Sequence, residues 1–302
     1  MKILILGGNG YVGSALYAAL TDHDVVSWDL CMWGPNLGYS VQADVHDITS
    51  CDVASFDMII MLSAHSSVGM CKQDPAGAIL NNVVNTQHVV SLLRPDQKFI
   101  YASSTGIYGK QTESCLESDA SYQHMNWYDI TKQTVDTHMQ QLIKQNRWIM
   151  GLRFGTVCGV SANTRSDLFL NNMVRHACEH KHFWVNNVHV SRSVLAICDL
   201  VHAIKTVCKK PFVGGIYNLK SFDVTMQQAA DQICAQLSVS CEVKPPDVLT
   251  YDFTVNQHAF CSTYDWQPLC TLEHVIDQLA QDTNKLAWCA RPNWPQGTSY
   301  AI

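Results

Sequence analysis

The chain has 302 residues, of which 47% are hydrophobic and 15% are charged. This composition excludes a disordered chain and a charged coiled coil, and the length suggests two domains or one large domain with a smaller appendage. The net charge of −6 argues against nucleic-acid and anionic-membrane partners. The apolar runs are too short for a membrane-spanning helix or a signal-peptide core, so we expect a cytoplasmic protein.

The first half of the chain alternates short apolar runs with segments of helical length. The apolar runs are residues 2–6, 24–29, 57–62, 98–102 and 148–154, and helices are expected at 14–20, 72–93 and 123–146. Strands that alternate with helices predict parallel βαβ units. The sequence therefore predicts an α/β fold with a Rossmann-like, doubly wound parallel sheet.

After Gly159 the pattern changes. A helix is expected at 167–180, short strands between 183 and 197, a helix from Asp199 and a strand at 215–219. We therefore predict a Rossmann domain at residues 1–159. Residues 160–302 are predicted to form mainly a smaller mixed α/β substrate domain, with segments that return to the first sheet. The last residues, 291–302, are rich in helix and strand breakers and are expected to lie over the surface.

Glycines mark the turn after the first strand. Gly7, Gly10 and Gly13 lie where a tight turn lets the backbone approach a pyrophosphate, which the helix N-terminus stabilises. Asp29 ends the second strand, where a carboxylate can bind both ribose hydroxyls and repel a 2′-phosphate. No Lys or Arg occurs between Lys2 and Lys72, so NAD is favoured over NADP. Asp44 and Val45 follow the expected third strand, where they can hold the adenine edge; the alternative for Asp44 is a solvated loop acid.

Three further residues form a candidate catalytic set. Tyr128 and Lys132 are four apart in a helical segment and therefore share a face. A neighbouring ammonium and a positive nicotinamide ring would favour the phenolate, which makes Tyr128 usable as a base. Ser104 follows the strand at 98–102, at the sheet edge where doubly wound folds bind ligands.

The order and spacing of these motifs resemble those of the extended short-chain dehydrogenase/reductases, in the NAD-dependent nucleotide-sugar epimerase/dehydratase family. The matching segments are GGNGYVG, Asp29, Asp44-Val45, Leu62-Ser63-Ala64, Asn81-Asn82-Val83, SSTGIYG, Tyr128 with Lys132, LRFGTVCG, SANTRSDLFLN, Arg192, YNL at 217–219 and Trp266-Gln267-Pro268. The resemblance covers nearly the whole chain. It implies NAD as cofactor, a nucleotide-diphosphate sugar as substrate and a homodimer.

The resemblance also assigns residues to roles. The implied cofactor site contains Gly7, Asn9, Gly10, Tyr11, Val12, Gly13, Asp29, Asp44, Val45, Leu62, Ser63, Ala64, Asn81, Tyr128, Lys132 and Gly155. The implied substrate site contains Ser66, Ser67, Ser104, Thr156, Asn171 and Arg192, the last two at the diphosphate. Tyr128 would remove a hydroxyl proton while hydride passes to NAD, with Ser104 bonded to the oxygen and Lys132 on the nicotinamide ribose. The alternatives are that Ser66 and Ser67 are ordinary loop residues and that Arg192 is an ordinary surface cation.

Departures from the family pattern narrow the reaction. The 4,6-dehydratases carry an Asp-Glu pair where this chain has Thr105 and Gly106, so dehydration is disfavoured. Thr156 stands where many 4-epimerases have Asn, which leaves the sugar open. We expect a nucleotide-sugar epimerase, acting at C4; the alternatives are a reductase or dehydrogenase of the same family and a non-catalytic dinucleotide sensor.

Cysteine and histidine suggest neither disulfides nor a metal. The thirteen cysteines are scattered and include no CxxC pair, which predicts reduced, mostly buried thiols. The segment HACEHKH, residues 176–182, places His176 and His180 on one helical face. It lies at the end of a polar helix, where a solvated face is the ordinary outcome, so we expect no metal site.

Overall fold

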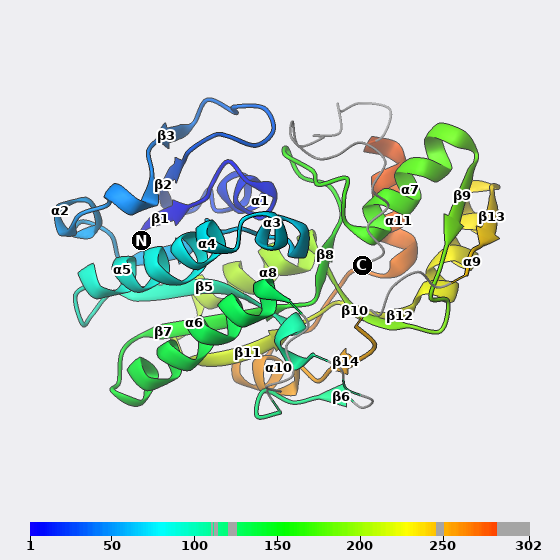
Figure 1. The fold of residues 1–302 in the computed structure, drawn as a ribbon. Coiled ribbons are helices and arrows are strands. Elements are labelled where there is room, and N and C mark those ends of the chain that lie inside the picture. The colour runs from blue at the N-terminus through cyan, green and yellow to red at the C-terminus, as the bar shows by residue number, and fades with distance from the viewer. Residues whose placement is uncertain (110, 112–113, 120–125, 246–250, 283–302) are drawn as a thin grey trace.

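The computed structural model describes residues 1–302 except 110, 112–113, 120–125, 246–250 and 283–302 (Figure 1). The predicted surface segment 291–302 and part of the predicted helix 123–146 therefore lie outside the described residues. Within the described residues, no helix has the length and hydropathy to cross a membrane.

A seven-stranded parallel sheet forms the centre of the molecule, in the order β11-β7-β5-β4-β1-β2-β3. Its strands are β1 (Lys2–Leu6), β2 (Asp24–Asp29), β3 (Ser40–Gln42), β4 (Met58–Met61), β5 (Lys98–Ser104), β7 (Ile149–Phe154) and β11 (Gly215–Leu219). The apolar runs form strands because helices cover both faces, which favours continuous rather than alternating hydrophobicity. The strand order reverses between β1 and β4, and such a switch point opens a ligand crevice at the carboxyl ends of the strands. The predicted doubly wound fold is confirmed.

Helices pack on both faces of this sheet (Figure 1). One apolar core joins it to α1 (Tyr11–Ala19), α8 (Ile197–Lys209) and α10 (His258–Tyr264). The core on the other face includes α2 (Ser50–Val53), α5 (Asn85–Leu92) and α6 (Trp127–Lys144). Two of these helices, α8 and α10, come from the second half of the chain, which also supplies the edge strand β11.

Several short helices follow the strands. These are the 3-10 helices η1 (Val45–Asp47) and η3 (Thr105–Tyr108), then α3 (Val68–Gln73), α4 (Pro75–Ala78) and the π-helical segment η2 (Ile79–Val84), which continues into α5. The predicted helix 72–93 is therefore broken after Gln73, where Asp74 caps α4 by accepting from the Gly77 N–H at 2.9 Å.

The smaller mixed α/β part packs around a core of its own. Its three-stranded sheet has the order β12-β10-β8, with β8 (Thr156–Cys158), β10 (Ser191–Ala196) and β12 (Phe222–Thr225). The helices are α7 (Phe169–His180), α9 (Met226–Leu237) and α11 (Leu272–Asp282). The strand pairs are β9 (His182–Val185) with β13 (Ser240–Val243), and β6 (Ser114–Cys115) with β14 (Thr254–Val255).

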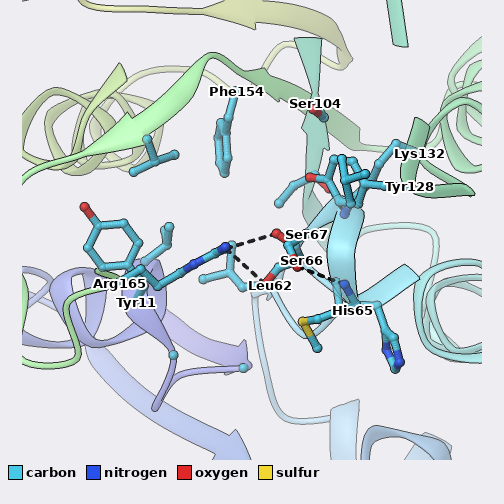
Figure 2. A pocket seen from close by; sticks show the side chains of 18 of the residues that line it. Tyr11, Leu62, His65, Ser66, Ser67, Ser104, Tyr128, Lys132, Phe154 and Arg165 are labelled. Carbon is cyan, nitrogen blue, oxygen red and sulfur yellow. Dashed lines mark hydrogen bonds between the residues drawn. The ribbon is translucent and has the colours of Figure 1, made fainter. Parts of the chain in front are cut away.

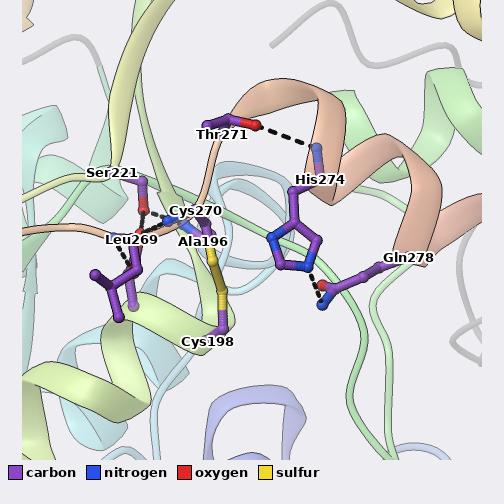
Figure 3. Close-up of a disulfide and its surroundings, with 9 residues drawn as sticks. Ala196, Cys198, Ser221, Leu269, Cys270, Thr271, His274 and Gln278 are labelled. Atoms are coloured by element: carbon purple, nitrogen blue, oxygen red, sulfur yellow. Dashed lines mark hydrogen bonds between the residues drawn. A yellow bond between two sulfur atoms is a disulfide. The ribbon is translucent and has the colours of Figure 1, made fainter.

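A disulfide between Cys198 and Cys270 corrects the expectation that all thiols are reduced (Figure 3). It links the start of α8 to the segment before α11. Asp199 brings the two segments together, since its buried carboxylate accepts hydrogen bonds from the Leu269 N–H at 2.8 Å and the Cys270 N–H at 3.2 Å. No spacing rule relates two cysteines 72 residues apart, so the sequence could not reveal this pair.

Candidate active site

One cavity of about 1190 Å³ opens at the carboxyl ends of β1, β4 and β5 (Figure 2). It exceeds the usual volume of a pocket for one small ligand, so it has room for a dinucleotide and a substrate together. All the predicted cofactor residues except Asn9 line it, and so do all the predicted substrate residues except Asn171. The fold thus brings residues from separate sequence motifs together at the switch point between β1 and β4.

The glycine turn fits a pyrophosphate. Gly7 has φ +90°, and a Cβ there would lie 2.6 Å from the backbone nitrogen of Ser63. At Gly13 a side chain would overlap the backbone of Gly7 and Gly8. Gly10 is the N-cap of α1 and offers no side-chain cap, and the first-turn residues Tyr11, Val12 and Gly13 line the cavity. Phosphate oxygens suit such a bare helix N-terminus.

Asp29 is held at the wall of the same cavity. Its carboxylate accepts hydrogen bonds from the Asn9 N–H at 3.0 Å and from the Cys31 N–H at 2.7 Å. The Asn9 side chain turns away from the cavity and ties two loop segments together, donating to the Pro35 carbonyl and accepting from the Leu37 N–H, each at 3.0 Å. Asn9 therefore supports the Asp29 carboxylate through its backbone.

The catalytic set occupies the opposite end of the cavity. Ser104 ends β5, and Tyr128 and Lys132 project from the first turns of α6, which Asn126 caps by accepting from the Asp129 N–H at 3.1 Å. The Lys132 ammonium donates to the Ala102 carbonyl at 2.8 Å and lies 5.7 Å from the centroid of the Tyr128 ring. The three side chains thus form one group (Figure 2).

Burial has the largest effect on the ionisation of this group. Burial raises the pKa of Tyr128 to about 12, although a hydrogen bond with Ser104 and the charge of Arg165 lower it. Burial also lowers the pKa of Lys132 to about 8, against the charge of Asp136. Ser104 and Arg165 lower the pKa of Tyr128, while the Lys132 ammonium donates to the Ala102 carbonyl beside the ring. That Lys132 also favours the phenolate of Tyr128 stays a prediction.

His65 connects the loop after β4 to the helices. Its backbone N–H donates to the side-chain oxygen Oδ1 of Asn82 at 2.7 Å, and the Asn82 side-chain amide donates to the His65 carbonyl and to the Thr131 hydroxyl of α6. The neighbouring Asn81 amide lies 3.0 Å from the His65 ring. Both asparagines belong to the π-helical segment η2, and π turns are frequent at functional sites.

Arg192 lines the cavity beside a residue that no motif indicated. Its guanidinium lies 5.7 Å from the centroid of the Tyr251 ring, and burial lowers the pKa of Arg192 to about 10. The Tyr251 hydroxyl donates to Asp129 at 2.7 Å and accepts from the Asn126 amide at 2.6 Å. Tyr251 thus connects the predicted diphosphate-binding arginine to the first turn of the catalytic helix.

Asn171 lies behind the cavity rather than in it. Its side chain is fully buried in α7, accepts from the Gly159 N–H at 3.0 Å and donates to the Arg165 carbonyl at 2.8 Å. The amide nitrogen also lies 3.2 Å from the Tyr11 hydroxyl. Asn171 therefore holds the segment that borders the site, and its contact with a diphosphate stays a prediction.

Within the described residues, the side chains that could together hold a metal ion lie away from residues 176–182. His176 and His180 are near each other, with ring centroids 5.3 Å apart, but within the described residues three metal-ligating atoms gather at Cys198, Asp199 and Cys270 alone. The two sulfurs there are joined in the disulfide, and the carboxylate is already hydrogen-bonded. This arrangement is a structural link between segments.

Comparison with known proteins identifies the family. Residues 3–219 match the model of the NAD dependent epimerase/dehydratase family. The chain belongs to this family. NAD is accordingly its cofactor, and the glycine turn, the bare N-terminus of α1 and Asp29 fit that dinucleotide.

Individual members of the family share low sequence identity with this chain. The UDP-glucose 4-epimerase of Corynebacterium glutamicum is 29% identical over 148 residues, which cover 45% of each chain, so the match spans less than half of that relative's length. The crystal structure of the UDP-glucuronic acid 4-epimerase of Bacillus cereus superposes with a TM-score of 0.82 at 19% identity and covers 95% of this chain and 100% of its own. The NDP-hexosamine 5,6-dehydratase TunA gives a TM-score of 0.85 at 17% identity, covering 95% and 99%. These structures show the shared fold.

Proposed function

We propose that this protein is an NAD-dependent nucleotide-sugar 4-epimerase. The observation that carries the proposal is the joint position of Ser104, Tyr128 and Lys132 at one end of a cavity whose other end fits NAD. The resemblance to UDP-glucose and UDP-glucuronic acid 4-epimerases supports it.

Each side chain has a separate task in the proposed reaction. NAD, when bound, would supply the acceptor and donor for the hydride of the sugar carbon. Tyr128 takes the proton of the sugar hydroxyl and later gives it back, while Ser104 donates a hydrogen bond to the same oxygen. Lys132 supplies positive charge beneath the Tyr128 ring, and Arg165 adds to it. Because Tyr128 is buried, a nearby positive charge is needed to make its phenolate accessible near neutral pH.

Arg192 gives the proposal a substrate class. A buried guanidinium at the cavity wall suits a diphosphate, since charge-assisted hydrogen bonds to phosphate are strong in such surroundings. Ser66, Ser67 and Thr156 line the same cavity as Arg192 and Tyr128, and we assign them to the sugar. We propose a nucleotide-diphosphate sugar as substrate, and UDP sugars as the first candidates.

A homodimer through two helical segments is part of the proposal. Ile79, Leu80 and Val84 of η2 and Trp127 and Ile130 of α6 all have exposed apolar side chains, the largest exposure being 44% at Trp127. The segments η2 and α6 are in contact with each other. Apolar side chains exposed on adjacent helices are typical of an interface.

The test starts from freshly purified protein. We expect acid denaturation to release NAD in stoichiometric amount, and the intact protein to interconvert the C4 epimers of a UDP sugar with no net change in NADH absorbance. Replacing Tyr128 with Phe should abolish conversion and preserve NAD content. Net NADH formation or consumption would instead identify the reductase or dehydrogenase alternative, and release of water from the sugar would identify a dehydratase.

A further inference from the structure

Residues 159–167, which we call the strap, connect β8 to α7 and border the active-site cavity. Asn163, Thr164, Arg165 and Asp167 all line the cavity. The motifs of the cofactor site lie in the first half of the chain, except for Gly155, whereas the strap comes from the second half. The contacts of the strap with the first half of the chain indicate its role.

At the adenosine end, the strap is joined to both loops that surround Asp29. The Asn163 amide donates to the Asn9 carbonyl at 2.7 Å and to the Trp33 carbonyl at 2.9 Å. The Asn163 side chain is buried, and it packs so closely on Gly34 that any Cβ there would overlap it. One side chain of the strap therefore links the glycine turn to the loop after β2.

In the middle, the strap is joined to the first turn of α1, where the pyrophosphate site lies. The Tyr11 hydroxyl donates to the Gly159 carbonyl at 2.6 Å, and the Ser14 hydroxyl lies 3.4 Å from the Ser161 hydroxyl.

At the substrate end, Arg165 reaches the loop after β4. It donates to the carbonyl of Ser66 at 3.0 Å and to its hydroxyl at 3.3 Å (Figure 2). Asp167 fixes the same guanidinium through bonds of 2.9 and 2.6 Å. Attachments to the first half of the chain are therefore present from one end of the dinucleotide site to the other.

Hydrogen bonds within the strap keep its attachments in register. The Ser161 N–H donates to the Thr164 hydroxyl at 2.9 Å, which in turn donates to the Ser161 carbonyl at 2.7 Å. The Asn163 N–H donates to the Ser161 hydroxyl at 3.2 Å. These bonds join Ser161, Asn163 and Thr164 into one turn that directly precedes Arg165.

We propose that the strap retains NAD across catalytic cycles, with Asn163 as its attachment at the adenosine end and Arg165 as its attachment at the substrate end. Release of the cofactor then requires both attachments to break. The inference deepens the proposed function and rests on it in one respect: a reaction that returns its hydride has no need to exchange the cofactor.

The experiment measures release of NAD, independently of turnover. The protein is first loaded with radiolabelled NAD and is then diluted into a large excess of unlabelled NAD. Rapid filtration measures the label that the protein retains over time. We expect Asn163→Ala to accelerate release at least tenfold, which corresponds to about 1.4 kcal/mol. Asn172→Ala, one turn into α7 where the amide contacts Arg175, is the matched control and should release label at the wild-type rate.

The outcomes separate this proposal from the epimerase proposal. Equal release from wild type and Asn163→Ala would overturn the role of the strap, as would wild-type protein that loses its label within the filtration time. Unfolding midpoints of the cofactor-free variants show whether Asn163→Ala still folds; if it does not, Arg165→Met, which keeps the side-chain volume and removes the bonds to Ser66, must show the acceleration. Absence of epimerisation with slow release would leave the strap in place and reject the reaction alone.

Discussion

Burial sets the ionisation of Tyr128 and Lys132 before any ligand arrives. Both side chains are largely withdrawn from water, which disfavours the phenolate of one and the ammonium of the other. A lysine with a pKa of about 8 changes charge within the working range of many enzymes. The Lys132 ammonium is present below that pH and is lost above it. An activity that depends on this ammonium must therefore fall as the pH rises.

The first prediction concerns this alkaline change. We expect kcat/KM to fall above about pH 8, because the deprotonated Lys132 no longer stabilises the Tyr128 phenolate. In Lys132→Arg the guanidinium stays charged, so the fall at pH 8 should disappear even if the activity is lower. A pH profile of the Arg variant that still falls at pH 8 would show that another group is responsible.

The second prediction concerns Arg192. Replacement by Ala removes a buried cation from the cavity wall, and we expect the affinity for UDP to fall at least tenfold while the affinity for NAD changes less than twofold. Isothermal titration of each ligand measures both. Arg94→Ala, at an exposed ion pair with Asp96, is the control. An equal loss of affinity for UDP and NAD would contradict the assignment to the diphosphate.

Some residues of the site could be predicted from the sequence and others could not, for a physical reason. The grouping of Ser104, Tyr128 and Lys132 could be predicted, because a strand end and one helix face bring them together. Asn163 and Arg165 lie in the matching segment SANTRSDLFLN, but their bonds span 154 and 99 residues, and no local pattern indicates the partners. Tyr251 reaches Arg192 through a ring contact and matches no motif. Asn171 lies on the buried face of α7, where its side chain accepts from the Gly159 N–H of the strap, a contact that the sequence did not indicate.

At the scale of elements, the five long apolar runs of the first half became strands because hydrophobic continuity reports burial on both faces. The region 183–197 was harder to divide. It contains β9 and β10 in two different sheets, separated by a turn at Asn187 with φ +49°. The π-helical segment η2 leaves no signal in hydrophobic spacing, since it inserts a single residue into an otherwise continuous helix.

The third prediction tests how η2, the loop after β4 and α6 are held together. Asn82→Ala leaves the buried polar groups of His65 and Thr131 without their partner, and we expect a loss of about 1–3 kcal/mol in unfolding free energy. Chemical denaturation measures the loss. Asn81→Ala, whose amide contacts the His65 ring at the cavity, should cost less stability. Equal losses would remove the special role of Asn82.

At the scale of the whole molecule, the two halves share one core. The side chains of Leu200, Ile204, Phe260 and Trp266 belong to the same apolar cluster as those of β1. The boundary at residue 159 stays a prediction, and the return of later segments to the sheet shows that such a boundary would not mark an independent unit. Sequence composition changes at Gly159, but composition does not report which segments return.

The fourth prediction concerns the link between α8 and the segment before α11. Alkylation of the denatured, unreduced protein should leave Cys198 and Cys270 unmodified, and reduction should expose both. Because the bond closes a loop of 72 residues, its reduction is expected to lower the unfolding free energy by about 2–4 kcal/mol. Cys51→Ser, at an exposed free thiol, is the control. Alkylation of Cys198 and Cys270 without reductant would refute the bond.

The shared core has a consequence for synthesis. The ribosome delivers β1, β4, β5 and β7 long before α8, β11 and Trp266, which cover one face and the outer edge of the sheet. The strand β11 begins about 60 residues after the end of β7, and Trp266 follows about 110 residues after the end of β7. The nascent chain therefore exposes an unpaired strand edge during the first interval and apolar surface during the second. Chaperone dependence should therefore be concentrated in the interval between these two parts of the chain, and completion of the sheet must await the arrival of its last strand.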